Sequence, residues 1–200
     1  MEVALKKDPG RCGWCGTDPL YVDYHDEEWG VPITDDRKLF ELLLLEGAQA
    51  GLAWITILRK RENYRRAFDR FDPEIIASYG PEKVQQLLGN AGIVRNRLKI
   101  SSFIGNARAY LAIQDSGQTF SHYLWQMNGP PRQNDWKNLT QVPAKTPESD
   151  RMSRELKRQG FRFVGSTICY AFMQSAGMVN DHVRDCFRWE ACRKLGRKSV

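Results

Sequence analysis

Two pairs of side chains near opposite ends of the chain have the chemistry of metal ligands. Cys12 and His25 lie close to the start, and His182 and Cys186 lie close to the end of the 200 residues. Zinc accepts thiolate and imidazole ligands in tetrahedral sites, and a closed set of four protein ligands is normally structural. The spacing of His182 and Cys186 predicts two ligands one helical turn apart, both facing one ion. A zinc ion bound by both pairs would join the two ends of the chain.

Other cysteines leave alternatives to this ligand set open. Cys12 and Cys15 form a C-x-x-C pair, a pattern that occurs in zinc sites and in redox dithiols. Cys192 could complete a different set of ligands. No βαβ pattern surrounds the C-x-x-C pair, which argues against a redox role. Buried cysteines that bind no metal are also common.

A carboxylate, Glu46, follows a run of four leucines at 42–45. It lies either in solvent at a helix end or in the interior, where it needs a hydrogen-bond partner or a proton. The aromatic residues near it in the sequence form either a plain core or a pocket, because aromatic rings stack on nucleobases and attract cations. These aromatic residues are Trp14, Tyr21, Tyr24, Trp29 and Trp54.

The segment RQGFRFVGST at 158–167 is a candidate DNA contact. Gly160 and Gly165 bracket a hairpin between two helical patterns. Backbone N–H groups at the start of the second helix favour an anion such as a DNA phosphate. Nearby positive charges would add salt-dependent affinity; they are Arg151, Arg154, Lys157, Arg158 and Arg162. The simpler interpretation is a helical hairpin with a solvated basic face.

Helical periodicity recurs along the chain, and strand patterns are weak throughout. Apolar spacing, proline starts and glycine ends predict helices at 35–46, 62–71, 81–90, 95–114, 146–158 and 167–175. The polar segment 126–147 holds four prolines and is predicted to be mostly loop. We therefore expect an all-α fold, in which two helical lobes surround a cleft.

Length and composition restrict the class of protein. Two hundred residues, 42% of them hydrophobic, suffice for one domain of two lobes, 1–200, with a buried core. Five cysteines, an odd number without regular spacing, argue for a reducing, cytoplasmic location. No apolar run is long enough for a membrane span, and no secretory signal is recognisable. A net charge of +6 favours a nucleic-acid partner, and the lack of an exposed apolar stripe predicts a monomer.

Six segments together resemble the 3-methyladenine DNA glycosylase I family, which belongs to the helix-hairpin-helix glycosylase superfamily. They are DPLYVDYHDEEWGVP at 18–32, LEGAQAGLAWIT at 45–56, AGIVRNR at 91–97, FIGNARAY at 103–110, GFRFVGSTICY at 160–170 and VNDH at 179–182. The likeness runs from about residue 11 to residue 186, and neither 1–9 nor the tail after Phe187 receives a role. It implies an all-α fold with a helix-hairpin-helix at 150–177 and a structural zinc that joins 10–30 to 180–188.

The resemblance also implies roles for individual positions. The zinc ligands of the family fall on Cys12, His25, His182 and Cys186. Its base pocket falls on Glu46, Tyr24 and Trp54, with Tyr21 and Trp14 nearby. Its DNA contacts fall on Gln49 and Leu52, which wedge into the gap left by the extruded base, and on the hairpin residues Gly160, Arg162, Gly165, Ser166 and Thr167. Many superfamily members carry a catalytic Asp where this chain has Asn180, and the adjacent Asp181 is out of register.

The implied activity is hydrolysis of the N-glycosidic bond of 3-methyladenine in double-stranded alkylated DNA, releasing the free base without a lyase step. Glu46 is the expected catalytic residue, which accepts hydrogen bonds from the adenine edge while Tyr24 and Trp54 sandwich the ring. One alternative is a zinc-stapled DNA-binding module without catalysis, which would not need Glu46 in a pocket. A zinc hydrolase is a second alternative, and it would need an open coordination position.

Overall fold

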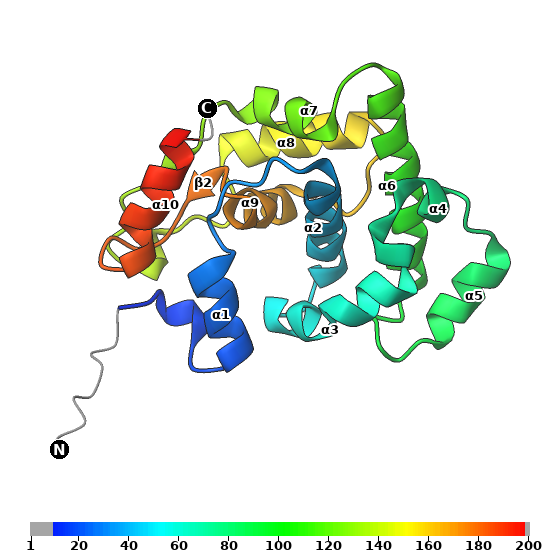
Figure 1. Ribbon diagram of the computed structural model, residues 1–200, viewed down its shortest axis with the longest axis horizontal. Helices are drawn as coiled ribbons and strands as arrows, with labels where there is room; N and C mark the ends of the chain where they lie inside the picture. The colour runs from blue at the N-terminus through cyan, green and yellow to red at the C-terminus, as the bar shows by residue number, and fades with distance from the viewer. Residues whose placement is uncertain (1–9, 199–200) are drawn as a thin grey trace.

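The computed structural model describes residues 10–198, and this part of the chain is built almost entirely of helices (Figure 1). Its ten α-helices are α1 (Pro19–Glu27), α2 (Asp36–Gln49), α3 (Trp54–Ala67), α4 (Pro73–Ala77), α5 (Pro81–Gly89), α6 (Arg97–Asp115), α7 (Phe120–Asn128), α8 (Pro147–Arg158), α9 (Ser166–Ser175) and α10 (Phe187–Lys198). The short 3₁₀ helices are η1 (Gly13–Cys15), η2 (Asp69–Phe71) and η3 (Leu139–Gln141). Two short strands, β1 (Arg132–Gln133) and β2 (Val179–Asn180), pair in parallel. The predicted all-α class is therefore confirmed.

Several helices begin where the sequence supplies a capping side chain. Asp35, Asn96 and Thr146 each precede a helix and accept a hydrogen bond from a free N–H group of its first turn. Thr146 and Ser149 satisfy each other's backbone N–H group in a capping box. After α9, Gly177 has a left-handed backbone with φ of +69°, so the predicted glycine at the end of this helix is confirmed.

Two helices differ from the sequence prediction near the candidate site. α2 continues to Gln49 instead of ending at 46, because the residues after Glu46 are also buried and gain from helical packing. Glu46 therefore lies inside a helix and not at its end. α3 runs without a break from Trp54 to Ala67, whereas the pattern indicated a separate helix at 62–71.

The predicted helical turn between the two C-terminal metal ligands is wrong. His182 and Cys186 precede α10 and are connected by a turn, in which the Cys186 N–H group donates to the Val183 carbonyl at 2.8 Å. The turn brings both side chains to the same side, so the two ligands meet without a helix.

α2 lies at the centre of the molecule and contacts α3, α6, α7 and α9 (Figure 1). A Cβ atom at Gly47 would lie 3.2 Å from the Cβ atom of Phe163, so the glycine permits α2 to approach the segment between α8 and α9 closely. Helices α4, α5 and α6 lie on one side of α2, α1, α9 and α10 lie on the other, and α3 crosses below the end of α2. None of the helices described is long and apolar enough to span a membrane.

Candidate active site and metal centre

The four predicted metal ligands lie together in the interior. The ligand atoms of Cys12, His25, His182 and Cys186 are all within 4.8 Å of one another, and all four side chains are buried. The Cys186 sulfur lies 3.4 Å from His25 Nε2 and 3.5 Å from His182 Nδ1. Ligands about 2.0–2.3 Å from one tetrahedral ion lie about 3.5 Å apart. The cluster can therefore hold a metal ion with two sulfur and two nitrogen ligands.

Neighbouring groups orient the two imidazoles toward the cluster. His25 Nδ1 lies 2.7 Å from a carboxylate oxygen of Asp26, and His182 Nε2 lies 3.0 Å from the Trp29 carbonyl oxygen. Each contact suits an N–H donor, which leaves the other ring nitrogen with a lone pair directed at the cluster. Such outer contacts are typical of histidines that bind a metal.

Cys15 and Cys192, the alternative ligands, lie outside this group of four. The Cys15 thiol donates to the Cys12 carbonyl at 3.1 Å, and burial raises its pKa. In contrast, the pKa of the Cys186 thiol is far below its usual value, because Cys12 and then both imidazoles hydrogen bond to its sulfur. The sulfur atoms of Cys12 and Cys186 both lie 3.5 Å from His182 Nδ1, so their positions fit metal ligands better than that of Cys15.

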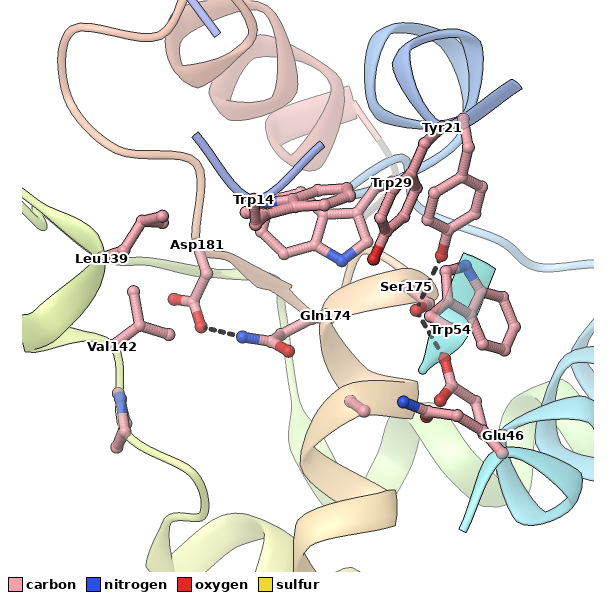
Figure 2. A pocket seen from close by; sticks show the side chains of 14 residues that line it. Trp14, Tyr21, Trp29, Glu46, Trp54, Leu139, Val142, Gln174, Ser175 and Asp181 are labelled. Carbon is pink, nitrogen blue, oxygen red and sulfur yellow. Dashed lines mark hydrogen bonds between the residues drawn. The ribbon is translucent and has the colours of Figure 1, made fainter. Parts of the chain in front are cut away.

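A pocket of about 380 Å³ adjoins this cluster (Figure 2). The Trp29 ring separates the two, since it lines the pocket and also lies 4.6 Å from the His182 ring, centroid to centroid. The aromatic residues of the pocket wall are Trp14, Tyr21, Tyr24, Trp29 and Trp54. Its polar residues are Glu46, Gln49, Gln174, Ser175 and Asp181. The structure thus brings together every residue predicted for base binding.

Glu46 is 2% exposed and has one hydrogen-bond partner among residues 10–198. Its Oε1 accepts from the Ser175 hydroxyl at 2.7 Å, and the Ser175 oxygen accepts in turn from the Tyr24 hydroxyl at 2.9 Å. Burial raises the pKa of Glu46 to about 8, and the Ser175 bond opposes this rise. Because its pKa is lower in the unfolded chain, Glu46 stabilises the fold at acidic pH and loses this contribution as the pH rises through about 8.

The other carboxylate oxygen of Glu46, Oε2, is buried without a hydrogen-bond partner among the described residues, and so are the indole N–H groups of Trp14 and Trp54. A buried polar atom without a partner is costly, which makes these three groups candidates for contacts with a ligand. When Glu46 is ionised, the three groups together offer one acceptor and two donors to a flat polar molecule.

The predicted sandwich of a base between Tyr24 and Trp54 does not fit their packing. Their ring centroids are 5.6 Å apart at an interplanar angle of 48°, the separation of a directly packed aromatic pair. A third ring does not fit between them. The two rings form one continuous wall, and a stacked base would contact this wall from inside the pocket.

Replacement of Ser175 by Ala is expected to raise the pKa of Glu46 above its value of about 8. The hydroxyl stabilises the ionised carboxylate, and a hydrogen bond of about 1 kcal/mol corresponds to roughly one pH unit. A ¹³C NMR titration of the Glu46 carboxyl measures the shift. Tyr24→Phe is the matched control, because it keeps the Ser175 bond to Glu46 and should change the pKa less. An unchanged titration in Ser175→Ala would contradict this account of the carboxylate.

The two residues predicted to wedge into the DNA, Gln49 and Leu52, lie at the C-terminal end of α2 and in the turn that follows it. Gln49 ends α2 and lines the pocket, and Leu52 is 40% exposed beyond it. The buried ammonium group of Lys99 in α6 donates to the carbonyl oxygens of Ala48 at 2.8 Å and Ala50 at 2.7 Å. This charge caps the C-terminal end of α2 and fixes the turn relative to the rest of the helix.

The segment between α8 and α9 is anchored on α6 by a single side chain. Asn106 accepts from the Arg162 N–H group at 2.8 Å and donates to the Arg162 carbonyl at 3.1 Å. Phe161 and Val164 are buried on both sides of it, and the side chain of Arg162 is exposed. The predicted hairpin therefore presents Arg162 to solvent, and Gly165 precedes the first turn of α9.

Replacement of Asn106 by Ala is expected to destabilise this hairpin by about 1–3 kcal/mol, because it leaves the peptide groups of Arg162 without partners. Faster hydrogen exchange of the Arg162 amide and a lower melting temperature would measure the loss. Gly105→Ala is the neighbouring control, since a Cβ atom there meets nothing within 4 Å. If the Arg162 amide exchanges equally slowly in both variants, Asn106 does not hold the hairpin.

Three polar residues of the pocket were not predicted from the sequence, namely Gln174, Ser175 and Asp181. Gln174 and Ser175 belong to α9, which reads as an ordinary apolar helix, and no local pattern marks them. Asp181 was expected to be out of register, yet it lines the pocket. Asn180 points elsewhere, since its amide donates to Gln133 Oε1 at 2.8 Å and to the Trp189 carbonyl at 2.9 Å.

Comparison with known proteins identifies the class to which this fold and pocket belong. Residues 14–189 match the model of the methyladenine glycosylase family. DNA-3-methyladenine glycosylase 1 of Escherichia coli (strain K12) is 53% identical over 177 residues, which cover 88% of this chain and 95% of that protein. The chain belongs to the methyladenine glycosylase family.

Solved structures agree with this assignment. A crystal structure of 3-methyladenine DNA glycosylase I superposes with a TM-score of 0.88 at 53% identity, covering 89% of this chain and 98% of the other. A tyrosine-to-phenylalanine variant of 3-methyladenine DNA glycosylase I in complex with 3-methyladenine superposes with a TM-score of 0.86 at 34% identity, covering 88% and 96%.

Proposed function

We propose that this protein is a DNA-3-methyladenine glycosylase of base-excision repair. It hydrolyses the N-glycosidic bond of 3-methyladenine in alkylated double-stranded DNA, releases the free base and leaves an abasic site. The observation that carries the proposal is the free, buried oxygen of Glu46 in an aromatic pocket. Family membership and the likeness to a structure that binds 3-methyladenine support it.

The charge of the lesion explains why the pocket needs no proton donor. A methyl group at N3 makes the purine a cation while it is still attached to the sugar. When the bond from C1′ to N9 breaks, its electron pair neutralises the ring, and the base leaves uncharged. A water oxygen then bonds to C1′ and loses a proton. The departing base therefore requires no general acid, which agrees with Asn180 pointing away from the pocket.

The enzyme must extrude the nucleotide from the duplex to reach this bond. We propose that Glu46 accepts a hydrogen bond from the exocyclic amine of the base, and that Tyr24, Trp54, Tyr21 and Trp14 contact the ring. The cation–π attraction of aromatic faces, about 0.5–2 kcal/mol, favours the charged lesion. Gln49 and Leu52 fill the gap left in the duplex. The hairpin, from Gly160 to Thr167 with Arg162, contacts phosphates.

We propose that the metal of the Cys12, His25, His182 and Cys186 cluster is zinc and that its role is structural. Two thiolates and two imidazoles are a ligand set that zinc prefers, and four protein ligands leave no position for a catalytic water. The metal would therefore join the N-terminal segment to the turn before α10 without taking part in bond cleavage. This reasoning also disfavours a zinc hydrolase.

Release of 3-methyladenine from alkylated duplex DNA tests the proposal. The purified protein, incubated with DNA treated with a methylating agent, should liberate 3-methyladenine, which chromatography and mass spectrometry identify. A heat-denatured sample controls for spontaneous depurination. A protein that binds the alkylated duplex but releases no base would instead be a DNA-binding module without catalysis.

A further inference from the structure

A second carboxylate, Asp181, lines the same pocket as Glu46 and has a different environment. Asp181 is 1% exposed. Its Oδ1 accepts from Asn134 Nδ2 at 2.6 Å and from Trp136 Nε1 at 2.7 Å. Its Oδ2 accepts from the Tyr170 hydroxyl at 2.6 Å and from Gln174 Nε2 at 2.8 Å. Four donors therefore occupy the acceptor positions of one carboxylate.

These four contacts define the charge of Asp181. The indole nitrogen and the two amide nitrogens only donate, and together they contact both carboxylate oxygens, so an ionised, acceptor-only carboxylate matches them. All four donors are neutral, and no Lys, Arg or His among the described residues forms an ion pair with Asp181. The negative charge is thus fixed by hydrogen bonds and is not cancelled by a neighbouring cation.

Glu46 provides a contrast within the same pocket. It has a single donor, Ser175, and burial favours its protonated form. Of the two carboxylates, Asp181, with four donors against one, is therefore the better placed to hold a negative charge in the pocket. Figure 2 shows Gln174 between Asp181 and Glu46, with its amide nitrogen bonded to Asp181. This bond uses one N–H group of the Gln174 amide and leaves its oxygen and its second N–H group for a ligand, and the adjacent anion polarises that amide.

We propose that Asp181, acting through Gln174, gives the pocket a permanent negative potential that selects a cationic N-alkylpurine over neutral adenine. The inference rests on the proposed function and adds a positioning residue to it. A fixed charge in a water-poor pocket acts more strongly than in solvent. The same potential favours the positive charge that appears on the sugar as the bond breaks.

Two ligands that differ in charge, and otherwise by one methyl group at N9, test the inference. The 3,9-dimethyladeninium ion is positive at pH 8 and represents the lesion attached to its sugar, whereas 3-methyladenine is uncharged at pH 8. Isothermal titration calorimetry at pH 8 gives the affinity of each for the intact protein. In Asp181→Asn we expect the affinity for the cation to fall about tenfold or more, a change of about 1.4 kcal/mol, and the affinity for the neutral base to change less than about twofold.

Two further variants keep the result interpretable. Gln174→Met keeps the charge of Asp181 but removes the amide, and it should also lower the preference for the cation. Tyr170→Phe removes one donor and keeps both charge and amide, so it should retain the preference. Melting temperature and metal content identify any loss of folding, which matters because Asp181 precedes His182. If Asp181→Asn does not fold, the affinities of Gln174→Met for the two ligands test the inference on their own.

Equal losses for both ligands, or an unchanged preference in Asp181→Asn and Gln174→Met, would overturn the inference and leave Asp181 a structural residue. Base release by the unaltered protein separates this outcome from failure of the proposed function. If the unaltered protein releases 3-methyladenine while the variants keep their preference for the cation, only the inference is wrong.

Discussion

Replacing Glu46 by Gln is expected to lower the rate of 3-methyladenine release by roughly a hundredfold, equivalent to about 3 kcal/mol, the upper range for a hydrogen bond to a charged group. The neutral amide lacks the negative charge that Glu46 carries when it is ionised, and it can place an NH₂ group against the amine of the base. Ser175 can still donate to the remaining amide oxygen, so the pocket keeps its shape. Single-turnover assays on alkylated duplex DNA and calorimetry with free 3-methyladenine measure the two losses.

The same substitution should affect stability in the opposite direction. Since the pKa of Glu46 in the folded protein is about 8, its ionisation destabilises the unliganded fold at higher pH. Glu46→Gln should therefore melt at a higher temperature than the unaltered protein at pH 9, and the difference should shrink toward pH 6. Glu41→Gln is a control on the same helix, because Glu41 pairs with Arg65 outside the pocket. Unchanged release and unchanged base binding in Glu46→Gln would show that the pocket is assigned wrongly.

Replacing Cys186 by Ser is expected to remove the bound metal and to lower the free energy of unfolding by more than about 5 kcal/mol. Structural zinc sites contribute roughly 10–16 kcal/mol of apparent binding energy, as large as the total stability of a typical domain. The loss of stability should be greatest in the two segments that the site joins, which are the N-terminal segment and the turn before α10. Elemental analysis of the unaltered protein should find about one zinc ion per chain, as expected for a site with four protein ligands. Thermal unfolding measures the free energy of unfolding.

Cys15→Ser is the matched control for this experiment. Cys15 is also buried and lies close to the cluster, but its thiol donates to a backbone carbonyl and is not among the four ligands. It should retain the zinc and most of the stability. A Cys186→Ser protein that keeps its metal, or unaltered protein that is folded and metal-free, is incompatible with a structural zinc.

The local sequence predicted features that depend on residue type and nearest neighbours. Thr146 caps the helix predicted at 146–158, because a cap needs only the few N–H groups beside it. The Cys and His residues indicated a metal site, since few other side chains bind zinc, but residue type alone left Cys15 and Cys192 open as ligands. Glu46 stood out because a carboxylate among leucines is unusual wherever it lies.

Tertiary structure decided what distant segments do to one another. The buried carboxylate of Glu46 accepts its hydrogen bond from Ser175, which is 129 positions away in the sequence. No local pattern indicates that contact. Asp181 is held in the pocket wall by hydrogen bonds from Asn134 and Trp136 and from two side chains of α9. Residue types thus determined which chemistry is available to this protein. The packing of remote helices determined which groups are desolvated and paired, and therefore which carboxylate is the better placed to hold a negative charge.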